Sequence, residues 1–149
     1  TVSGSPRIEN CTLADLAGWG ITNSAGATPT IRNCIAWGNG MGGIGVNGTV
    51  TYSCFQGALG GEGNIGADPL FADTIYYHLE SRNRYYSGGY FSGGTWVRST
   101  VHSPCIDAGD PASSDANEPK PSGRANMGCY GNTIAADQTF ITATILLIR

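Results

Sequence analysis

The chain has 149 residues, of which 40% are hydrophobic and 13% are charged, and it contains 23 glycines. This size and composition fit one all-β domain of short strands and tight turns, and they exclude long amphipathic helices. The formal charge is −3 and Lys120 is the only lysine, so the sequence offers no basic surface for nucleic acid or for anionic membranes.

The first part of the chain contains a repeat. Pro6–Cys11 (PRIENC) is echoed by Pro29–Cys34 (PTIRNC) at a shift of 23 residues, and a weaker third copy ends at Cys54. This period, with two short extended runs in each copy, is typical of a β-solenoid in which each strand pairs with its equivalent one repeat away. Leucine-rich repeats share the period, but their leucine framework is absent. We therefore predict a right-handed parallel β-helix of a few coils over residues 1–66.

The repeat also predicts which side chains stack inside the coils. One inward row consists of Ile8, Ile31 and Val50. A second inward row, the core ladder, consists of Cys11, Cys34 and Cys54. We interpret the cysteines as structural core and not as a redox or metal site, because reactive thiols need exposed electropositive surroundings that these segments lack.

Other residues of the repeat face outward or form corners. Asn10 and Asn33 fall at a corner, where an amide can bond the backbone, and Ser53 interrupts this row in the third copy. Glu9 and Arg32 fall side by side on the outer face, which predicts an ion pair between repeats. The repeats place neither the cationic base of a polysaccharide lyase nor the carboxylate pair of a glycosidase. We expect no catalytic residue, no cofactor and no metal ligand.

Residues 67–133 are predicted to form the last coil and an irregular cap. The stretch Tyr85–Trp96 is rich in aromatic residues and glycine, which predicts a hairpin-like excursion whose rings cover the coils. The alternative is that these rings are exposed and stack on sugars. His78 and His102 are expected to be packed or surface residues, since the sequence places no nucleophile or carboxylate beside either of them.

Four segments in the second half carry a resemblance to a known family. They are Ala67–Asp73 (ADPLFAD), Tyr77–Leu79 (YHL), Ser103–Pro111 (SPCIDAGDP) and Asn126–Thr133 (NMGCYGNT). In this order they resemble the closing region of bacterial right-handed parallel β-helix proteins of the choice-of-anchor Q type. The resemblance implies a large secreted or cell-surface protein and no particular activity. That family usually has a small residue where Cys129 stands, and this departure predicts a Cys105–Cys129 disulfide.

Residues 134–149 are predicted to form a C-terminal β-strand. The run Phe140–Arg149 is apolar and rich in β-branched residues, but it is too short to span a bilayer as a helix, which takes about 20 residues. It packs on its own coils, leads into a further domain, or is donated to a neighbouring subunit. The candidate subunit-contact residues are Phe140, Ile141, Ile145, Leu146, Leu147 and Ile148.

Together these features favour a non-catalytic extracellular module. We expect a cell-surface scaffold, adhesin or filament subunit that forms homo-oligomers through its coil ends or its C-terminal strand. The alternative is a carbohydrate-binding module, or a fragment of a polysaccharide-active β-helix enzyme, with polysaccharide as the partner. Asn10 and Asn47 begin the glycosylation triplets NCT and NGT, so they are candidate sites of glycan attachment.

Overall fold

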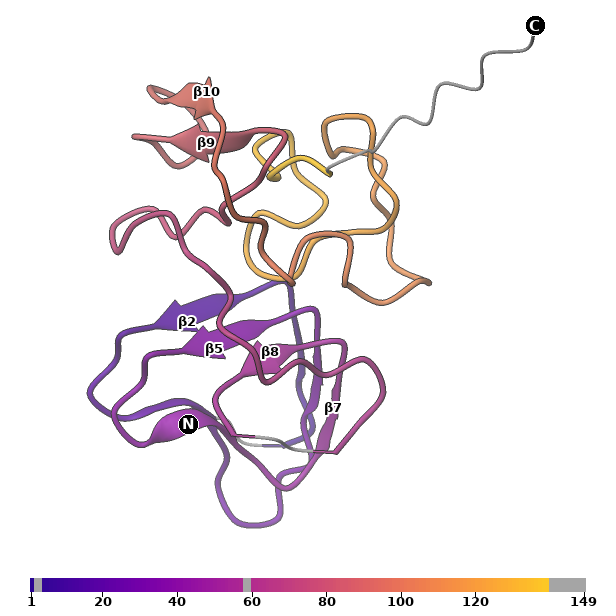
Figure 1. Cartoon of the computed structure of the whole chain (residues 1–149). Helices are drawn as coiled ribbons and strands as arrows, with labels where there is room; N and C mark the ends of the chain where they lie inside the picture. The colour runs from indigo at the N-terminus through magenta and orange to yellow at the C-terminus, as the bar shows by residue number, and fades with distance from the viewer. Residues whose placement is uncertain (2–3, 58–59, 140–149) are drawn as a thin grey trace, which may run out of the picture.

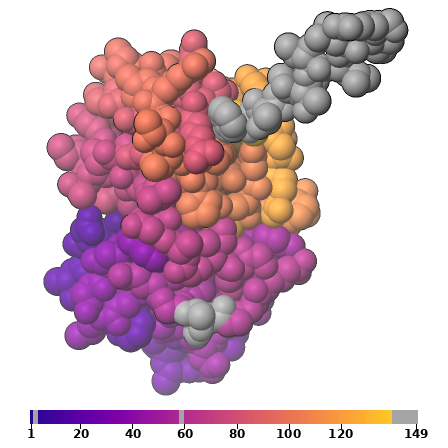
Figure 2. Space-filling model, in the orientation of Figure 1, coloured from indigo at the N-terminus to yellow at the C-terminus, as the bar shows by residue number. Residues whose placement is uncertain are grey.

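The computed structural model describes residues 1, 4–57 and 60–139. Within these ranges the chain is all-β, with ten short strands and no helix. Figure 1 shows the eight strands of the first half in the lower part of the molecule and an irregular second half above them. In the space-filling view of Figure 2 the two halves are in contact along a broad front. No helix in the described part of the chain could cross a membrane.

The strands of the first half form three parallel sheets. The first sheet contains β1 (Arg7–Glu9), β4 (Thr30–Arg32) and β7 (Thr49–Thr51). The second contains β2 (Thr12–Ala14), β5 (Ile35–Trp37) and β8 (Cys54–Phe55). The third contains β3 (Trp19–Thr22) and β6 (Gly42–Gly45). Each of the first two repeats therefore supplies one strand to every sheet.

Strand pairing defines the register of the repeats. Ile8 pairs with Ile31, and Ile31 pairs with Val50, so the predicted isoleucine–valine row is confirmed. The third repeat is shorter than the cysteine spacing suggested, because β5 and β8 pair Ile35 with Cys54. The counterpart of Cys34 is therefore not Cys54.

A left-handed corner residue marks the same position in each repeat. Asn10, Asn33 and Tyr52 have φ angles of 49°, 53° and 46°. Asparagine adopts this conformation more readily than most residues that have a Cβ atom. Tyr52, and not Ser53, thus interrupts the asparagine row. The prediction for Ser53 was wrong because it aligned the repeats on their cysteines instead of on the corner.

The residue after the corner turns its side chain inward. The side chains of Cys11, Cys34 and Ser53 each donate a hydrogen bond to the carbonyl oxygen two residues earlier, at 3.2, 3.2 and 3.0 Å. Ser53 Oγ also accepts the backbone N–H of Cys34 at 3.1 Å. Cys54 lies one position further on, in a separate apolar cluster with Cys105. The predicted three-cysteine ladder was therefore wrong in its last member.

The interior consists of two apolar clusters. The first lies between the sheets of the first half and contains Ile21, Ile31, Cys34, Ala36, Ile44, Val50 and Phe55. The second joins the first half to the second half and contains Ile35, Cys54, Leu79, Cys105, Ile106 and Met127. Packing is tight where the sheets meet, since a Cβ atom on Gly43 would lie 2.6 Å from the Cβ of Phe55. Glycine is required at this position by space.

The second half has little regular structure. Its hairpin pairs β9 (Tyr85–Ser87) with β10 (Thr95–Val97) in antiparallel fashion, which confirms the predicted excursion. Bonds from side chains to backbone hold much of the rest. Buried Glu118, for example, accepts the amides of Asn126 and Asn132, both at 2.8 Å. Burial raises the pKa of Glu118 to about 7.

The predicted Cys105–Cys129 disulfide is not present. Both residues are free thiols. Cys105 is buried, and its thiol interacts with that of Cys54. Cys129 is exposed, and its backbone N–H donates to Thr12 Oγ1 at 3.0 Å. The two cysteines therefore face different parts of the coils.

The predicted C-terminal strand can be compared with the structure over its first residues alone. Residues 134–139 form turns and irregular chain packed against the second half. The segment Phe140–Arg149, with all the candidate subunit-contact residues, lies outside the described residues.

Candidate functional site

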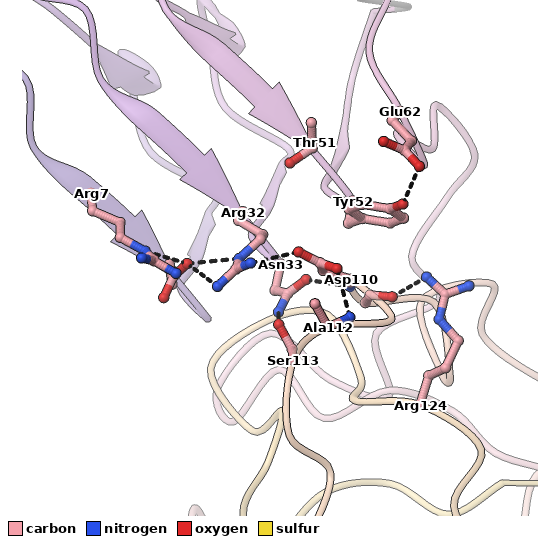
Figure 3. A network of polar contacts seen from close by, with 12 residues as sticks. Arg7, Arg32, Asn33, Thr51, Tyr52, Glu62, Asp110, Ala112, Ser113 and Arg124 are labelled. Atoms are coloured by element: carbon pink, nitrogen blue, oxygen red, sulfur yellow. Dashed lines mark hydrogen bonds and ion pairs between the residues drawn. The ribbon is translucent and has the colours of Figure 1, made fainter.

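A polar groove of about 320 Å³ lies over the sheet of β1, β4 and β7. Its lining residues are Arg7, Glu9, Thr30, Arg32, Thr51 and Asp110. Arg32 makes ion pairs with Glu9 at 2.7 Å and with Asp110 at 2.5 Å. The ion pair predicted between Glu9 and Arg32 is thus confirmed. Figure 3 shows Arg7, Arg32 and Asp110 following one another from the first repeat to the second half.

The charges of this groove are paired with one another. Arg7, whose side chain is 63% exposed, contacts the same Glu9 oxygen at 2.6 Å. The Ala112 N–H and the Arg32 guanidinium hold the pKa of Asp110 below its ordinary value. A carboxyl group with a low pKa is a poor general acid. The arrangement is suited to joining the second half to the coils, and it does not present the raised-pKa acid that glycoside cleavage requires.

Asn33 lies at the centre of this junction. Its side chain is fully enclosed, with 1% of the residue exposed. Asn33 Oδ1 accepts the amide of Asp110 at 2.7 Å, and its Nδ2 donates to Ser113 Oγ at 2.8 Å. The carbonyl oxygen of the same residue accepts the amide of Gly128 at 2.8 Å. One corner residue thus holds two segments of the second half, the turn of Asp110 and Ser113 and the chain at Gly128.

Two further contacts extend the network in Figure 3. The Tyr52 hydroxyl donates to Glu62 Oε1 at 2.5 Å. The Arg124 guanidinium lies 5.4 Å from the centre of the Tyr52 ring and also donates to the carbonyl of Gly109. The tyrosine that replaces asparagine at the third corner therefore still contacts the second half, but through its ring.

An aromatic groove of about 390 Å³ lies between the first repeat and the second half. Its lining residues are Thr12, Leu13, Ala14, Leu16, Ile75, Tyr76, Tyr77, Tyr90, Phe91, Cys129 and Tyr130. Tyr90 and Phe91 are 55% and 54% exposed. Tyr90 meets Tyr76 edge to face, as Phe91 meets Tyr130, with interplanar angles of 77° and 60°. The rings therefore form apolar walls and not a flat platform.

One carboxylate stands beside this groove. The Tyr77 hydroxyl donates to Asp15 Oδ2 at 3.0 Å. Asp15 adjoins Ala14 and Leu16 in the sequence, and both of these line the groove. Asp15 itself is not a lining residue, so its carboxylate orients the hydroxyl of Tyr77, which does line the groove. No lysine or arginine is found among its described lining residues.

A buried histidine–carboxylate pair lies behind the groove. The His78 ring stacks on Tyr130, with centroids 3.7 Å apart. Its Nδ1 is 3.2 Å from Asp137 Oδ1, and its Nε2 is 3.1 Å from the carbonyl oxygens of Gly89 and Tyr90. A carbonyl oxygen can only accept, so Nε2 carries a proton.

Asp137 also holds backbone groups of the second half. It accepts the amides of Leu79 at 2.6 Å and Tyr86 at 3.0 Å, and it is 2% exposed. Burial raises the pKa of Asp137 above its ordinary value. The expectation that His78 has no carboxylate partner was wrong, because the two residues are 59 positions apart and no local motif links them. Enclosed in this way, the pair suits a structural role.

An apolar hollow lies at the outer end of the first repeat. Its volume is about 180 Å³, and it is lined by Thr1, Ile8, Cys11, Leu13, Gly20, Ile21 and Thr22. Among the described residues, β1, β2 and β3 are edge strands of their sheets. Ile8 and Cys11 are only partly buried, whereas their counterparts Ile31 and Cys34 are fully buried. The end therefore presents core-type side chains and unpaired strand edges together.

Other candidate sites are less developed. Within the described ranges, no group of three or more acidic, histidine or cysteine side chains could hold a metal ion. Of the two candidate glycan sites, Asn47 is exposed and Asn10 is half-buried.

Comparisons with protein-family models, with curated proteins and with solved structures gave no match.

Proposed function

We propose that the three parallel sheets are the faces of a right-handed parallel β-helix, and that the chain is a non-catalytic structural module of a secreted or cell-surface protein. The constant register between the first two repeats supports this fold. The paired charges over β1, β4 and β7 support a structural role, because they join the second half to the coils.

The apolar hollow and the edge strands β1, β2 and β3 carry the proposal that the module self-associates. Unpaired strand edges beside an apolar hollow form a template for further strands. At the opposite end, residues 62–65 already run along β8, where the amide of Phe55 donates to the carbonyl of Ile65 at 3.0 Å. The first-repeat ends of two copies are therefore the surfaces best suited to cover each other. Such a contact is isologous and closes into a pair, which favours a scaffold built from pairs over an open filament.

A charge in the hollow is expected to abolish this association. Ile8→Arg places a guanidinium where the second copy would bury an apolar side chain, and an unpaired buried charge costs far more than the contact yields. Light scattering coupled to size-exclusion chromatography, over a wide range of concentrations, should show dimers for the wild type and monomers for the variant.

Ile75→Arg is the matched control for this experiment. Ile75 is 62% exposed and lies in the aromatic groove, away from the hollow, so the variant should still dimerise. A circular-dichroism melt of each protein verifies that it is folded. A wild type that stays monomeric at every concentration, or an Ile8→Arg variant that dimerises normally, would refute self-association through this end.

The aromatic groove favours carbohydrate binding as a second candidate function. Exposed rings of Tyr90 and Phe91 offer apolar faces to a sugar ring, and the volume of the groove suits a small ligand. The Tyr77 hydroxyl, which donates to Asp15, can accept a hydrogen bond from a sugar hydroxyl. Because the groove has a carboxylate beside it and no cation among its described lining residues, a neutral sugar fits better than a uronate.

Phe91→Ala is expected to weaken binding of a neutral β-linked glucose hexasaccharide about tenfold, which is the loss of one aromatic contact. Isothermal titration calorimetry measures the change, with Ile8→Arg as a variant that should bind like the wild type. A glucuronate hexasaccharide should bind more weakly than the neutral one. No binding of either sugar to the wild type would exclude this function for the groove.

A further inference from the structure

Cys11 and Cys34 occupy equivalent positions in the first two repeats. The amide of Ile35 donates to the carbonyl of Cys11 at 2.8 Å, so the two backbones are neighbours in one sheet at this point. Adjacent strands lie about 4.8 Å apart, which falls within the Cα separation of roughly 4.4 to 6.8 Å found in disulfides. The Cys11 side chain also packs against the apolar cluster that contains Cys34. The backbone spacing is thus one that a disulfide can bridge.

The two thiols differ in access and in acidity. Cys11 lines the open hollow, whereas Cys34 is fully buried beneath it. The neighbouring Cys34 thiol lowers the pKa of Cys11 to about 6, and the proximity of Cys11 together with burial raises the pKa of Cys34. Cys11 is therefore the more easily ionised thiol of the two, and the thiolate is the reactive form.

We propose that Cys11 and Cys34 are an oxidisable thiol pair that closes into a disulfide between the first and second repeats when a small disulfide reaches Cys11 through the hollow. The Cys11 sulfur attacks one sulfur of the small disulfide and releases its other half as a thiolate. The Cys34 thiol then gives its proton to that thiolate, and the Cys34 sulfur attacks the Cys11 sulfur and releases the second half. Two protein thiols are oxidised and one small disulfide is reduced to two thiols.

The other cysteines provide internal comparisons. Cys54 and Cys105 also have interacting thiols, but both residues are fully buried and line no described hollow. Cys129 is exposed as a residue, but its sulfur is partly enclosed. This enclosure, together with the nearby Cys11 and Asp137, raises the pKa of its thiol. In the folded chain we therefore expect the Cys11–Cys34 pair to close first.

The test uses the reduced, folded chain at a concentration too low for a second copy to cover the hollow, with oxidised glutathione at neutral pH. The reaction is stopped with acid, remaining thiols are alkylated in denaturant, and intact mass and a tryptic map are recorded. The expected result is the loss of two of the five thiols, with the peptide of residues 8–32 linked to that of residues 33–82. Fragmentation assigns the link to Cys34 or Cys54. A link from Cys11 to Cys129 or to Cys54 would overturn the proposal.

Single variants separate a reactive pair from two packed thiols. Cys34→Ser should fold, since Ser53 occupies the equivalent position in the third repeat, and it should stop at a glutathione adduct on Cys11. Cys11→Ser should keep the Cys34 thiol reduced, and Cys129→Ala should close the pair like the wild type. The rate of closure should rise with pH through about 6, following the pKa of Cys11. The proposal would be refuted by a closure rate that rises only near the ordinary cysteine pKa, or by a wild type that keeps all its thiols.

Discussion

Asp137→Ala should destabilise the chain by about 4 kcal/mol, because it leaves two buried amides and a buried imidazole without their acceptor. The amides are those of Leu79 and Tyr86, and the imidazole is that of His78. Asp137 is 2% exposed, so bulk solvent does not reach these groups in the folded chain. Urea unfolding followed by circular dichroism gives the free energy of unfolding of wild type and variant.

Asp73→Ala is the matched control. Asp73 also accepts two backbone amides, from Ile75 at 2.8 Å and Tyr76 at 2.6 Å, but it is half-exposed and solvent can take over both bonds. We expect Asp73→Ala to lower the free energy of unfolding by about 1 kcal/mol. Equal losses in the two variants would show that the cost comes from turn geometry and not from burial of the His78–Asp137 pair.

Asn33→Ala is expected to cost about 3 kcal/mol, from the left-handed backbone and from a buried amide left unpaired. The alanine keeps the φ of 53° but loses the acceptor for the Asp110 amide and the donor to Ser113. The contact between the coils and the second half is thereby weakened at its centre. The same urea experiment measures the effect.

Asn10→Ala separates the two contributions. Asn10 has nearly the same backbone conformation, with φ of 49°, but its Oδ1 has no hydrogen-bond partner among the described residues. The variant should therefore show only the conformational cost, about 1 kcal/mol. If Asn10→Ala were as damaging as Asn33→Ala, the bonds of Asn33 to the second half would not be what stabilises it.

The sequence allowed the first half to be predicted because its information is periodic. Equivalent residues in neighbouring repeats pair directly, so the alignment of Ile8 with Ile31 already implied both the parallel pairing and the Glu9–Arg32 ion pair. The third repeat was misaligned by one residue. Cys54 suggested an alignment with Cys34, but the left-handed corner at Tyr52 sets the register. A tyrosine in the sequence does not indicate a left-handed backbone.

The second half could not be predicted in the same way. Its hairpin has a local glycine and aromatic pattern and was found from the sequence. Its other contacts join residues far apart, such as Arg32 with Asp110, 78 positions away. The disulfide prediction failed for the same reason, since no pattern in the sequence shows that Cys105 faces Cys54. The aromatic groove is lined by residues of both halves, so the sequence did not predict it either.

The contacts between the second half and the early repeats bear on how the molecule unfolds. In a simple solenoid each repeat contacts only its neighbours, so a terminal repeat can fray by itself. Here the amide of Cys129 bonds to Thr12 across 117 positions, and the hydroxyl of Tyr77 bonds to Asp15 across 62. Opening the first repeat therefore breaks bonds to the far end of the chain. Local openings of β2 and of the second half become one cooperative event, and their amide hydrogens exchange with solvent together.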